Sequence, residues 1–331
     1  MKILIIRFSS LGDIILTTPI LKMLRRQYPT DTIHFLTKQQ FVPILENNPN
    51  INLTIPYNKD EETIFVLAKK VREANYDLII DLQAKLNTFF IKLFNRKSTK
   101  LTYKKEHLHR WFLTKKLFAS HFEPVDSTVN LYASVLKKLN IELESIQTEI
   151  FLTPLNSKIT VREESKDTKK IVIAPGAKHF TKQYPPEYYS ELITMLKNEF
   201  KLDVILIGNK NEITLSQRIS NECEHQLIDL TGKTDLQELF DIINQADLFI
   251  SGDTGPMHIA AALQKPQIAI FGSTHPNLGF SPINENAIIM QRDLECRPCS
   301  LHGSAKCPKK HFKCMKDLKP DEIFAQIQTI L

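Results

Sequence analysis

The chain has 331 residues, of which 42% are hydrophobic, and this is enough to bury the cores of two domains. No stretch reaches about 18 uninterrupted apolar residues, so the sequence predicts no transmembrane helix. Charges occur within the first seven residues, which is not typical of a signal peptide, and we expect a cytoplasmic protein. The net charge of +6 is uneven, because residues 1–150 carry 22 Lys and Arg against 15 Asp and Glu. That half has either an anionic partner or a solvated basic surface.

Strand-like and helix-like segments alternate in the first half. The predicted strands are residues 3–8, 32–36, 53–56 and 77–82, and the predicted helices between them include 14–28 and 64–74. This alternation predicts an α/β domain with a parallel, doubly wound sheet.

The turn after the first strand, residues 9–13, has the sequence Ser-Ser-Leu-Gly-Asp. It lacks Gly-x-Gly-x-x-Gly, which argues against a dinucleotide-binding oxidoreductase. Asp13 is predicted to lie at the carboxyl end of the strand, where open α/β sheets bind ligands. Its carboxylate is either a first-turn acid that stabilises a helix dipole or a general base.

The second half repeats the same pattern. Residues 142–170 are polar and charge-dense, so we place the domain boundary near 155–168, with domains at 1–155 and 168–318. The predicted strands here are 170–174, 203–207, 227–230, 247–250 and 267–271, and the predicted helices include 186–200, 235–244 and 321–331. These elements predict a second Rossmann-like domain. We expect the C-terminal segment 319–331 to cross back to the first domain.

Residues 250–262 read as the end of a strand, a tight polar turn and the start of a helix. Gly252 and Gly255 allow the backbone to bend, and Asp253 and Thr254 are suited to cap the helix. The first amides of such a helix form an anion site, and His258 lies within the first turn. The alternative is an ordinary capped turn.

Basic residues gather between 96 and 116, with aromatic residues among them. The basic residues are Arg96, Lys97, Lys100, Lys104, Lys105, His107, His109, Arg110, Lys115 and Lys116, and the aromatic ones are Tyr103, Trp111 and Phe112. Nucleic-acid binding, a solvated helix face and docking of an acidic ligand are the three interpretations.

Four cysteines, Cys296, Cys299, Cys307 and Cys314, lie within nineteen residues. Their spacing permits a structural zinc site, although only the first two form a Cys-x-x-Cys pair, and free thiols are the other interpretation. A nucleic-acid or metal-binding interaction protein would use this cluster and the basic segment.

Three motifs together resemble glycosyltransferase family nine, the lipopolysaccharide heptosyltransferases. Residues 253–258 have the pattern Asp-x-Gly-x-x-His, followed by Ala-Ala-Ala-Leu, by Pro266 and by Phe-Gly-Ser-Thr at 271–274. Residues 7–13, with Thr17 and Pro19 beyond, resemble the amino-terminal signature of the family. Lys182 begins Lys-x-Tyr-Pro-x-x-x-Tyr, which is similar to a further family element.

The resemblance implies a GT-B architecture, in which two Rossmann-like domains face a central cleft. It implies inverting, metal-independent transfer of a heptose from ADP-heptose to the acidic inner core of lipopolysaccharide, with Asp13 as the general base. It implies no required cofactor, no nucleic-acid partner and a peripheral position on the inner membrane. No Asp-x-Asp pair occurs, in agreement with metal independence. The implied donor-binding residues are Gly12, Lys182, Glu212, Asp253, Thr254, Gly255 and His258, and the acceptor-binding ones are Lys104, Lys105, His109 and Arg110.

The donor-side motifs concern the nucleotide and the diphosphate more than the sugar. A transferase of the same family that uses a different nucleotide sugar or acceptor glycan is therefore the main alternative.

Overall fold

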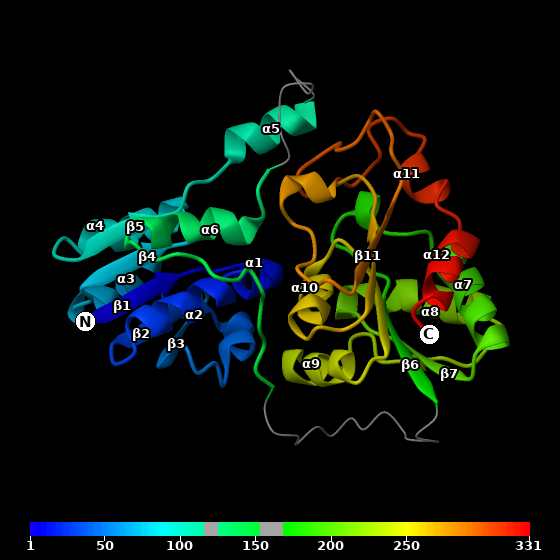
Figure 1. Ribbon diagram of the computed structural model, residues 1–331, viewed down its shortest axis with the longest axis horizontal. Helices are drawn as coiled ribbons and strands as arrows, with labels where there is room; N and C mark the ends of the chain where they lie inside the picture. Colours follow the sequence, from blue (N-terminus) through cyan, green and yellow to red (C-terminus); the bar gives the residue numbers. More distant parts are fainter. Residues whose placement is uncertain (116–124, 153–167) are drawn as a thin grey trace. The chain divides into compact units, whose positions relative to one another are not determined.

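The computed structural model describes residues 1–115, 125–152 and 168–331. The chain divides into two compact units, each with its own parallel sheet (Figure 1). Unit 1 consists of Met1–Glu106 and Asp126–Thr153, and unit 2 consists of His107–Val125 and Pro154–Leu331. The boundary that we expected near 155–168 lies almost entirely outside the described residues. None of the helices in the described ranges is long and apolar enough to cross a membrane.

The sheet of unit 1 has the strand order β3-β2-β1-β4-β5, and all its strands are parallel. The strands are β1 (Lys2–Ile6), β2 (Thr32–Lys38), β3 (Leu53–Tyr57), β4 (Leu78–Asp81) and β5 (Thr99–Thr102). β1 is central, which explains its continuous apolar run: Ile3 to Ile6 are fully buried.

Helices cover both faces of this sheet. They are α1 (Leu11–Ile15), α2 (Thr18–Gln27), α3 (Ile64–Glu73), α4 (Leu86–Phe94) and α6 (Thr128–Lys137), with a 3-10 segment η1 (Gln39–Leu45). Leu67 of α3 and Ile91 of α4 share one hydrophobic cluster with Leu4 of β1, so α3 and α4 cover the same face. The chain moves from β1 to β2 towards one edge of the sheet, whereas it moves from β4 to β5 towards the other edge. Because both crossovers are right-handed, α1 and α2 lie on the face opposite α3 and α4. α6 packs against α2 there.

The single helix predicted over residues 14–28 is two helices. Thr17 and Thr18 direct their hydroxyl groups to the carbonyl oxygens of Ile14 and Ile15, at 2.7 and 2.8 Å. Pro19 has no N–H to continue the helical ladder. The chain therefore ends α1 at Ile15 and starts again with Pro19 in the first turn of α2.

The sheet of unit 2 has the order β11-β10-β9-β6-β7-β8 and is also entirely parallel. Its strands are β6 (Lys169–Ala174), β7 (Leu202–Leu206), β8 (Ile228–Asp229), β9 (Leu248–Gly252), β10 (Gln267–Phe271) and β11 (Ala287–Gln291). The strand order reverses at β6, which lies between β9 and β7. The sequence prediction of two Rossmann-like α/β domains is confirmed by these two sheets.

The longer helices of unit 2 form two layers on its sheet. They are α7 (Pro186–Glu199), α8 (Ile213–Glu222), α9 (Leu236–Asn244), α10 (Gly255–Ala262) and α12 (Pro320–Gln328). The unit also contains the helices α5 (His107–Lys115) and α11 (Lys313–Lys316) and the 3-10 segments η3 (Phe180–Lys182), η4 (Lys210–Glu212) and η5 (Pro276–Leu278). α8 and α12 pack on α7, whereas α9 packs on α10.

Two segments differ from the expected domain organisation. We expected the C-terminal helix to cross back to the first domain, but α12 packs on α7 within unit 2, because Ile323 and Ile327 form a buried apolar stripe in that core. We also assigned residues 107–125 to the first domain, but they belong to unit 2. The Arg110 guanidinium lies 4.5 Å from the centre of the Phe280 ring, and Val125 N–H donates to Asn277 O at 2.9 Å.

Candidate functional site

Several predicted donor residues lie at the carboxyl edge of the unit 2 sheet. The strand order reverses at β6, and the crevice outside such a switch point is where open α/β sheets bind ligands. The turns that follow β6, β7 and β9 meet at this edge and supply Lys182, Glu212 and Asp253.

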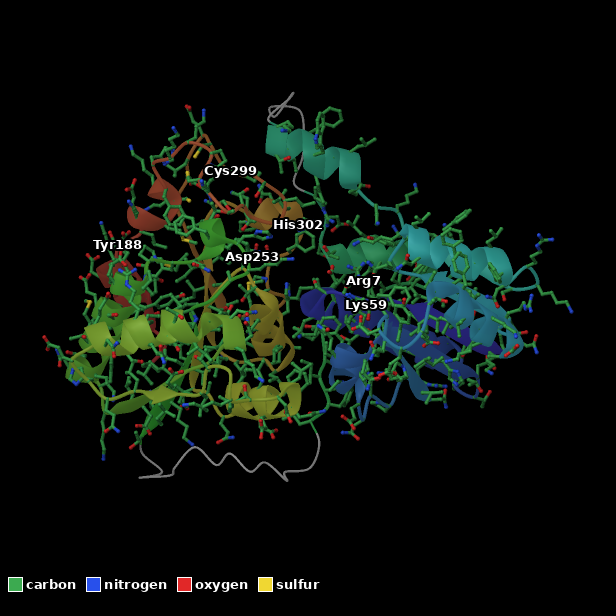
Figure 2. All side chains as sticks on the ribbon, turned by 180° about the vertical axis from the view of Figure 1, so that it is seen from behind. Arg7, Lys59, Tyr188, Asp253, Cys299 and His302 are labelled. Carbon is green, nitrogen blue, oxygen red and sulfur yellow. The ribbon has the colours of Figure 1, made fainter. Side chains whose placement is uncertain are left out.

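Lys182 and Asp253 form an ion pair at this edge. Lys182 Nζ lies 2.7 Å from Asp253 Oδ2, and the two side chains are only 15% and 11% exposed. η3 supplies the lysine. The aspartate, which is labelled in Figure 2, directly follows β9. A Cβ atom at Gly252 would lie 2.9 Å from Lys182 O, so only glycine lets the η3 turn rest on the end of β9. Both charged residues were predicted from the sequence, but their pairing was not.

α10 starts directly after this pair. Thr254 occupies the N-cap position without a side-chain cap hydrogen bond, and Gly255 and Pro256 are the first two helical residues. His258 is buried in the first turn. The helix presents its N-terminal dipole at the edge that carries Lys182, a combination suited to a phosphate group.

The side chain of Glu212 packs against the turn that follows β6. Its Oε2 accepts a hydrogen bond of 2.8 Å from Asn209 N–H, and a Cβ atom at Gly176 would lie 2.2 Å from Glu212 Cδ. Burial raises the pKa of Glu212 and outweighs the opposing effect of the Asn209 hydrogen bonds. A partly desolvated carboxylate at this edge is chemically suited to accept hydrogen bonds from hydroxyl groups of a ligand.

Asp13 lies in the corresponding place in unit 1, in α1 just beyond the carboxyl end of β1. Asp13 Oδ2 lies 2.7 Å from Arg7 Nη2, and it accepts hydrogen bonds from Ser10 Oγ at 2.7 Å and Ser10 N–H at 3.0 Å. Burial alone would raise the pKa of Asp13, but the charge of Arg7 and the bonds from Ser10 outweigh it, and the pKa is lowered. Asp13 is therefore ionised at neutral pH.

Arg7 and Tyr132 complete this cluster, and neither was among the site residues predicted from the sequence. Arg7 is 7% exposed and donates to Leu82 O at 2.6 Å, and Tyr132 donates to Asp13 Oδ1 at 3.2 Å. A cation directly after the buried apolar run from Ile3 to Ile6 is a signal for Arg7, because such a residue needs a buried partner. No feature of the sequence around Tyr132, which lies in α6, predicts its contact with Asp13. Gly12, predicted to bind the donor, lies in α1 of this unit, whereas the other predicted donor residues belong to unit 2.

The predicted acceptor residues are divided between the units. Lys104 and Lys105 follow β5 in unit 1, and His109 and Arg110 lie on α5 in unit 2. Lys105 Nζ donates to Ala84 O at 2.6 Å, and burial together with Lys85 and Arg7 lowers its pKa. Ala84 follows Leu82, whose carbonyl oxygen accepts from Arg7, by two residues, so Lys105 and Arg7 contact the same turn after β4. Lys116, the last residue of the basic segment, lies outside the described residues.

The four cysteines are not gathered into the arrangement that a structural zinc site needs. Among the residues that the structure describes, no group of three or more His, Cys, Asp or Glu is placed to hold a metal ion. Cys314 is packed in the core, where burial raises its pKa to about 12. The thiol of Cys299 donates to Cys296 O at 2.8 Å, while its N–H bonds to Ser273 O (Figure 2). Through this backbone hydrogen bond, the cysteine segment packs against the residues that directly follow β10.

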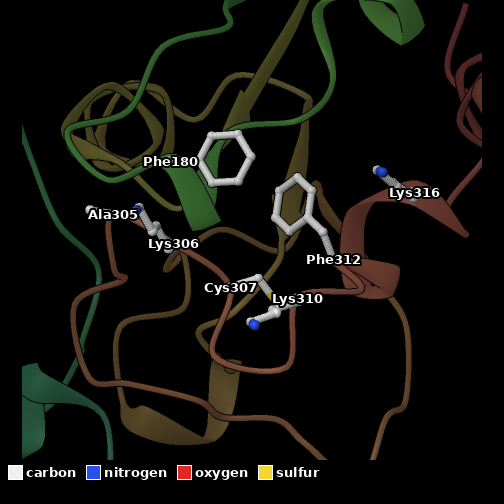
Figure 3. Close-up of a pocket in the computed structure, with 7 residues that line it drawn as sticks. All are labelled: Phe180, Ala305, Lys306, Cys307, Lys310, Phe312 and Lys316. Atoms are coloured by element: carbon white, nitrogen blue, oxygen red, sulfur yellow. The ribbon is translucent and has the colours of Figure 1, made fainter.

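A pocket of about 370 Å³ opens beside the cysteine segment (Figure 3). The rings of Phe180 and Phe312 stack at 4.8 Å on one side of it. The remaining lining residues are Ala305, Lys306, Cys307, Lys310 and Lys316. Phe180 belongs to η3, so this pocket shares a segment with Lys182 but contains none of the predicted donor residues.

Comparison with known proteins places this geometry in a family. Residues 64–310 match the description "Glycosyltransferase family 9 (heptosyltransferase)". The chain is 30% identical over 292 residues to lipopolysaccharide heptosyltransferase 3 of Escherichia coli, covering 84% of this chain and 85% of that protein.

Two solved structures share the fold. A family 9 glycosyl transferase of Veillonella parvula has a TM-score of 0.79 and 20% identity, and covers 99% of this chain and 96% of that one. The E. coli ADP-heptose lps heptosyltransferase II has a TM-score of 0.75 and 20% identity, with 100% and 98% covered.

Two parallel α/β units with these neighbours define the GT-B fold. The chain belongs to glycosyltransferase family 9, the heptosyltransferases. The fold and the family implied by the three sequence motifs are thereby confirmed.

Proposed function

We propose that the protein transfers a heptose from ADP-heptose to the acidic inner core of lipopolysaccharide, with inversion at the anomeric carbon. The observation that carries this proposal is the Asp13 cluster, where a carboxylate is held ionised at the carboxyl end of β1. The names of the E. coli relatives support the choice of donor and acceptor.

Unit 2 would bind the nucleotide diphosphate. Lys182 supplies a cation, and the backbone N–H groups of Gly255, Met257 and His258 in the first turn of α10 supply donors at the positive end of a helix. The carboxylate of Asp253 would repel a diphosphate, so we assign it the role of fixing the Lys182 side chain. Glu212 would accept hydrogen bonds from the ribose hydroxyls. Because Lys182 and the first amides of α10 offset the charge of the leaving diphosphate, no Mg²⁺ is needed in this scheme.

Asp13 would accept the proton of the acceptor hydroxyl. As that oxygen forms its bond to the anomeric carbon, the bond from this carbon to the diphosphate oxygen breaks, and ADP leaves with the electron pair. A single displacement of this kind inverts the anomeric configuration. Arg7 and Ser10 orient the carboxylate and keep it unprotonated before the reaction.

The acceptor would lie near the basic residues that follow β5. Lys105 contacts Ala84, two residues beyond the carbonyl of Leu82 that accepts from Arg7, and Lys104 is adjacent to Lys105, so both lysines are suited to the negative charges of an inner-core saccharide. His109 and Arg110 on α5 are further candidates. An acceptor anchored in lipid implies a cytoplasmic enzyme that works peripherally on the inner face of the inner membrane.

The test of the base is Asp13→Asn, which keeps the shape of the side chain but cannot accept the proton in the same way. A positioned general base contributes roughly 100- to 10,000-fold, so single-turnover rates should fall at least 100-fold. Affinity for ADP, measured by calorimetry, should stay unchanged. Asp77→Asn is the matched control, because its carboxylate accepts from Lys2 N–H at the opposite end of β1. Turnover near that of wild type in folded Asp13→Asn would refute the assignment.

A thermal-shift screen of nucleotide sugars tests the donor against the alternative of a different sugar. A ligand present at 100 times its Kd stabilises the folded state by about 2.7 kcal/mol, which gives a clear shift in Tm. We expect ADP-heptose to give the largest shift. A larger shift with another nucleotide sugar would reassign the donor within the same family.

A further inference from the structure

Unit 1 carries a group of exposed apolar side chains that its core does not use. Twelve large hydrophobic residues are exposed among the described parts of the chain, and five of them lie on α3 and α4. We call these five the α3–α4 apolar face: Phe65, Val66, Leu86, Phe89 and Leu93, which are 51%, 46%, 68%, 52% and 48% exposed.

The five residues form one surface because the two helices pack together (Figure 1). The rings of Phe65 on α3 and Phe90 on α4 lie 5.2 Å apart, and Phe89 contacts Phe90 at 5.9 Å. On α4, residues 86, 89 and 93 follow helical spacing on the outer side, whereas Ile91 is buried against the sheet. α4 is therefore apolar on both of its sides, although its core contacts need only one.

The charges beside this face are mainly positive. Residues 85–105 contain seven Lys and Arg and no Asp or Glu. Lys85 directly precedes α4, Arg96 and Lys97 follow it, and all three are exposed. The acidic residues in the neighbourhood are at the ends of α3: Asp60, Glu61, Glu62 and Glu73, of which Glu62 pairs with Lys70 and Glu73 with Lys69.

We propose that the α3–α4 apolar face docks unit 1 on an anionic phospholipid bilayer. Apolar side chains on a helix bind the boundary between headgroups and acyl chains, and neighbouring cations add attraction to anionic lipids. Exposed Leu and Phe with a basic border fit this partner better than a second copy of the chain, because facing copies would bring their basic residues together. The inference rests on the proposed function, in which the acceptor is itself anchored in lipid.

The experiment is flotation of the full-length protein with vesicles of phosphatidylethanolamine and phosphatidylglycerol, compared with vesicles of phosphatidylcholine alone. Wild type should bind the anionic vesicles, and more weakly as salt increases. Phe89→Ser combined with Leu93→Ser should reduce the partition coefficient about tenfold or more, because two large side chains no longer enter the interface. Lys85→Gln combined with Lys97→Gln should reduce the preference for anionic vesicles.

Leu53→Ser is the matched control, since Leu53 is 51% exposed in the same unit but lies on β3. It should bind vesicles like wild type. Equal losses in Leu53→Ser and in the α4 double variant would overturn the proposal, as would wild type that fails to float. If the α4 double variant converts a dimer to a monomer in sedimentation velocity while vesicle binding is unchanged, a second copy covers the face and the proposal is wrong.

Two further measurements separate this inference from the proposed function. The α4 double variant should keep wild-type affinity for ADP and wild-type turnover of a delipidated acceptor saccharide, because the face lies outside the donor and base clusters. Wild type that floats but binds no ADP would contradict the proposed function and leave the docking face intact.

Discussion

The guanidinium of Arg7, which directly follows β1, and the carboxylate of Asp13 in α1 lie 2.7 Å apart. Both groups are largely withdrawn from water, and their mutual attraction keeps Asp13 charged where burial alone would favour its neutral form. The pair thus sets the protonation state of the residue that we propose as the general base.

This pair predicts the position of the acidic limb in the pH profile of kcat/KM. Because the pKa of Asp13 is lowered from 3.8, its protonation should not reduce kcat/KM until the pH falls below that value. Ser10→Ala removes one hydrogen bond to the carboxylate, and Arg7→Met removes the neighbouring charge. Each change should raise the pKa and move the limb towards neutral pH, further in Arg7→Met. An acidic limb that stays in place in both variants would show that another group titrates.

The same shift links Asp13 to stability. A carboxylate whose pKa is lower in the folded state stabilises that state above its unfolded pKa, and this contribution disappears as the pH falls through the folded pKa. Wild type should therefore lose part of its stability below pH 3.8 through Asp13. Asp13→Asn should lack this component, which melting curves over the acidic range would show.

The ion pair of Lys182 and Asp253 predicts unequal effects on nucleotide binding. Lys182→Ala should weaken ADP binding about 10- to 100-fold, since hydrogen bonds to charged groups contribute roughly 1.5–3 kcal/mol. Asp253→Asn should weaken it less, because Lys182 is retained but less firmly held. Calorimetry on both variants and on their combination should show non-additive losses. Lys178→Ala, an exposed lysine of the same loop, should bind normally. Tighter binding in Asp253→Asn would mean that the carboxylate chiefly repels the diphosphate.

Chelation tests whether turnover needs a metal ion. Lys182 and the start of α10 supply positive charge at the proposed diphosphate site, and the sequence has no Asp-x-Asp pair. Turnover should therefore persist in EDTA at a rate close to that of the untreated enzyme. A complete loss that added Mg²⁺ restores would contradict this scheme.

Packing of α12 predicts a stability effect in unit 2. Ile323 is fully buried in the same cluster as Tyr189 and Leu192 of α7. Ile323→Ala should reduce the free energy of unfolding by about 2–5 kcal/mol, because it leaves a cavity in this core. Gln328→Ala, on the exposed side of the helix, should change it by about 0.5 kcal/mol or less. Denaturant titration followed by circular dichroism compares them, and equal effects would contradict the packing.

The strands that lie inside the sheets could be predicted from the sequence. β10 was predicted with its observed bounds, because a strand covered on both faces is a continuous apolar run. β5 was not among the predicted strands, since it lies at the edge of its sheet and has the sequence Thr-Lys-Leu-Thr. An edge strand needs less apolar surface, so a strand such as β5 can lack an apolar run; the edge strands β3 and β8, which lie in more apolar segments, were predicted.

The candidate site was predicted as separate residues and not as contacts. Asp13, Lys182 and Asp253 were each selected from a local motif that follows a strand. Their partners depend on how distant segments meet: Tyr132 reaches Asp13 from α6, 119 residues further along the chain. Contacts of this kind arise from the tertiary fold, for which a single sequence contains no periodic signal.

The assignment of α5 to unit 2 has a consequence for anyone who divides this protein. The chain passes between the units three times, near residues 106, 125 and 153, so neither unit is one continuous segment. A fragment that stops at residue 152 would keep α5 but lose Phe280, and would leave the Arg110 guanidinium without the ring on which it lies. An autonomous first domain is better obtained by replacing residues 107–125 with a short linker than by truncating the chain once.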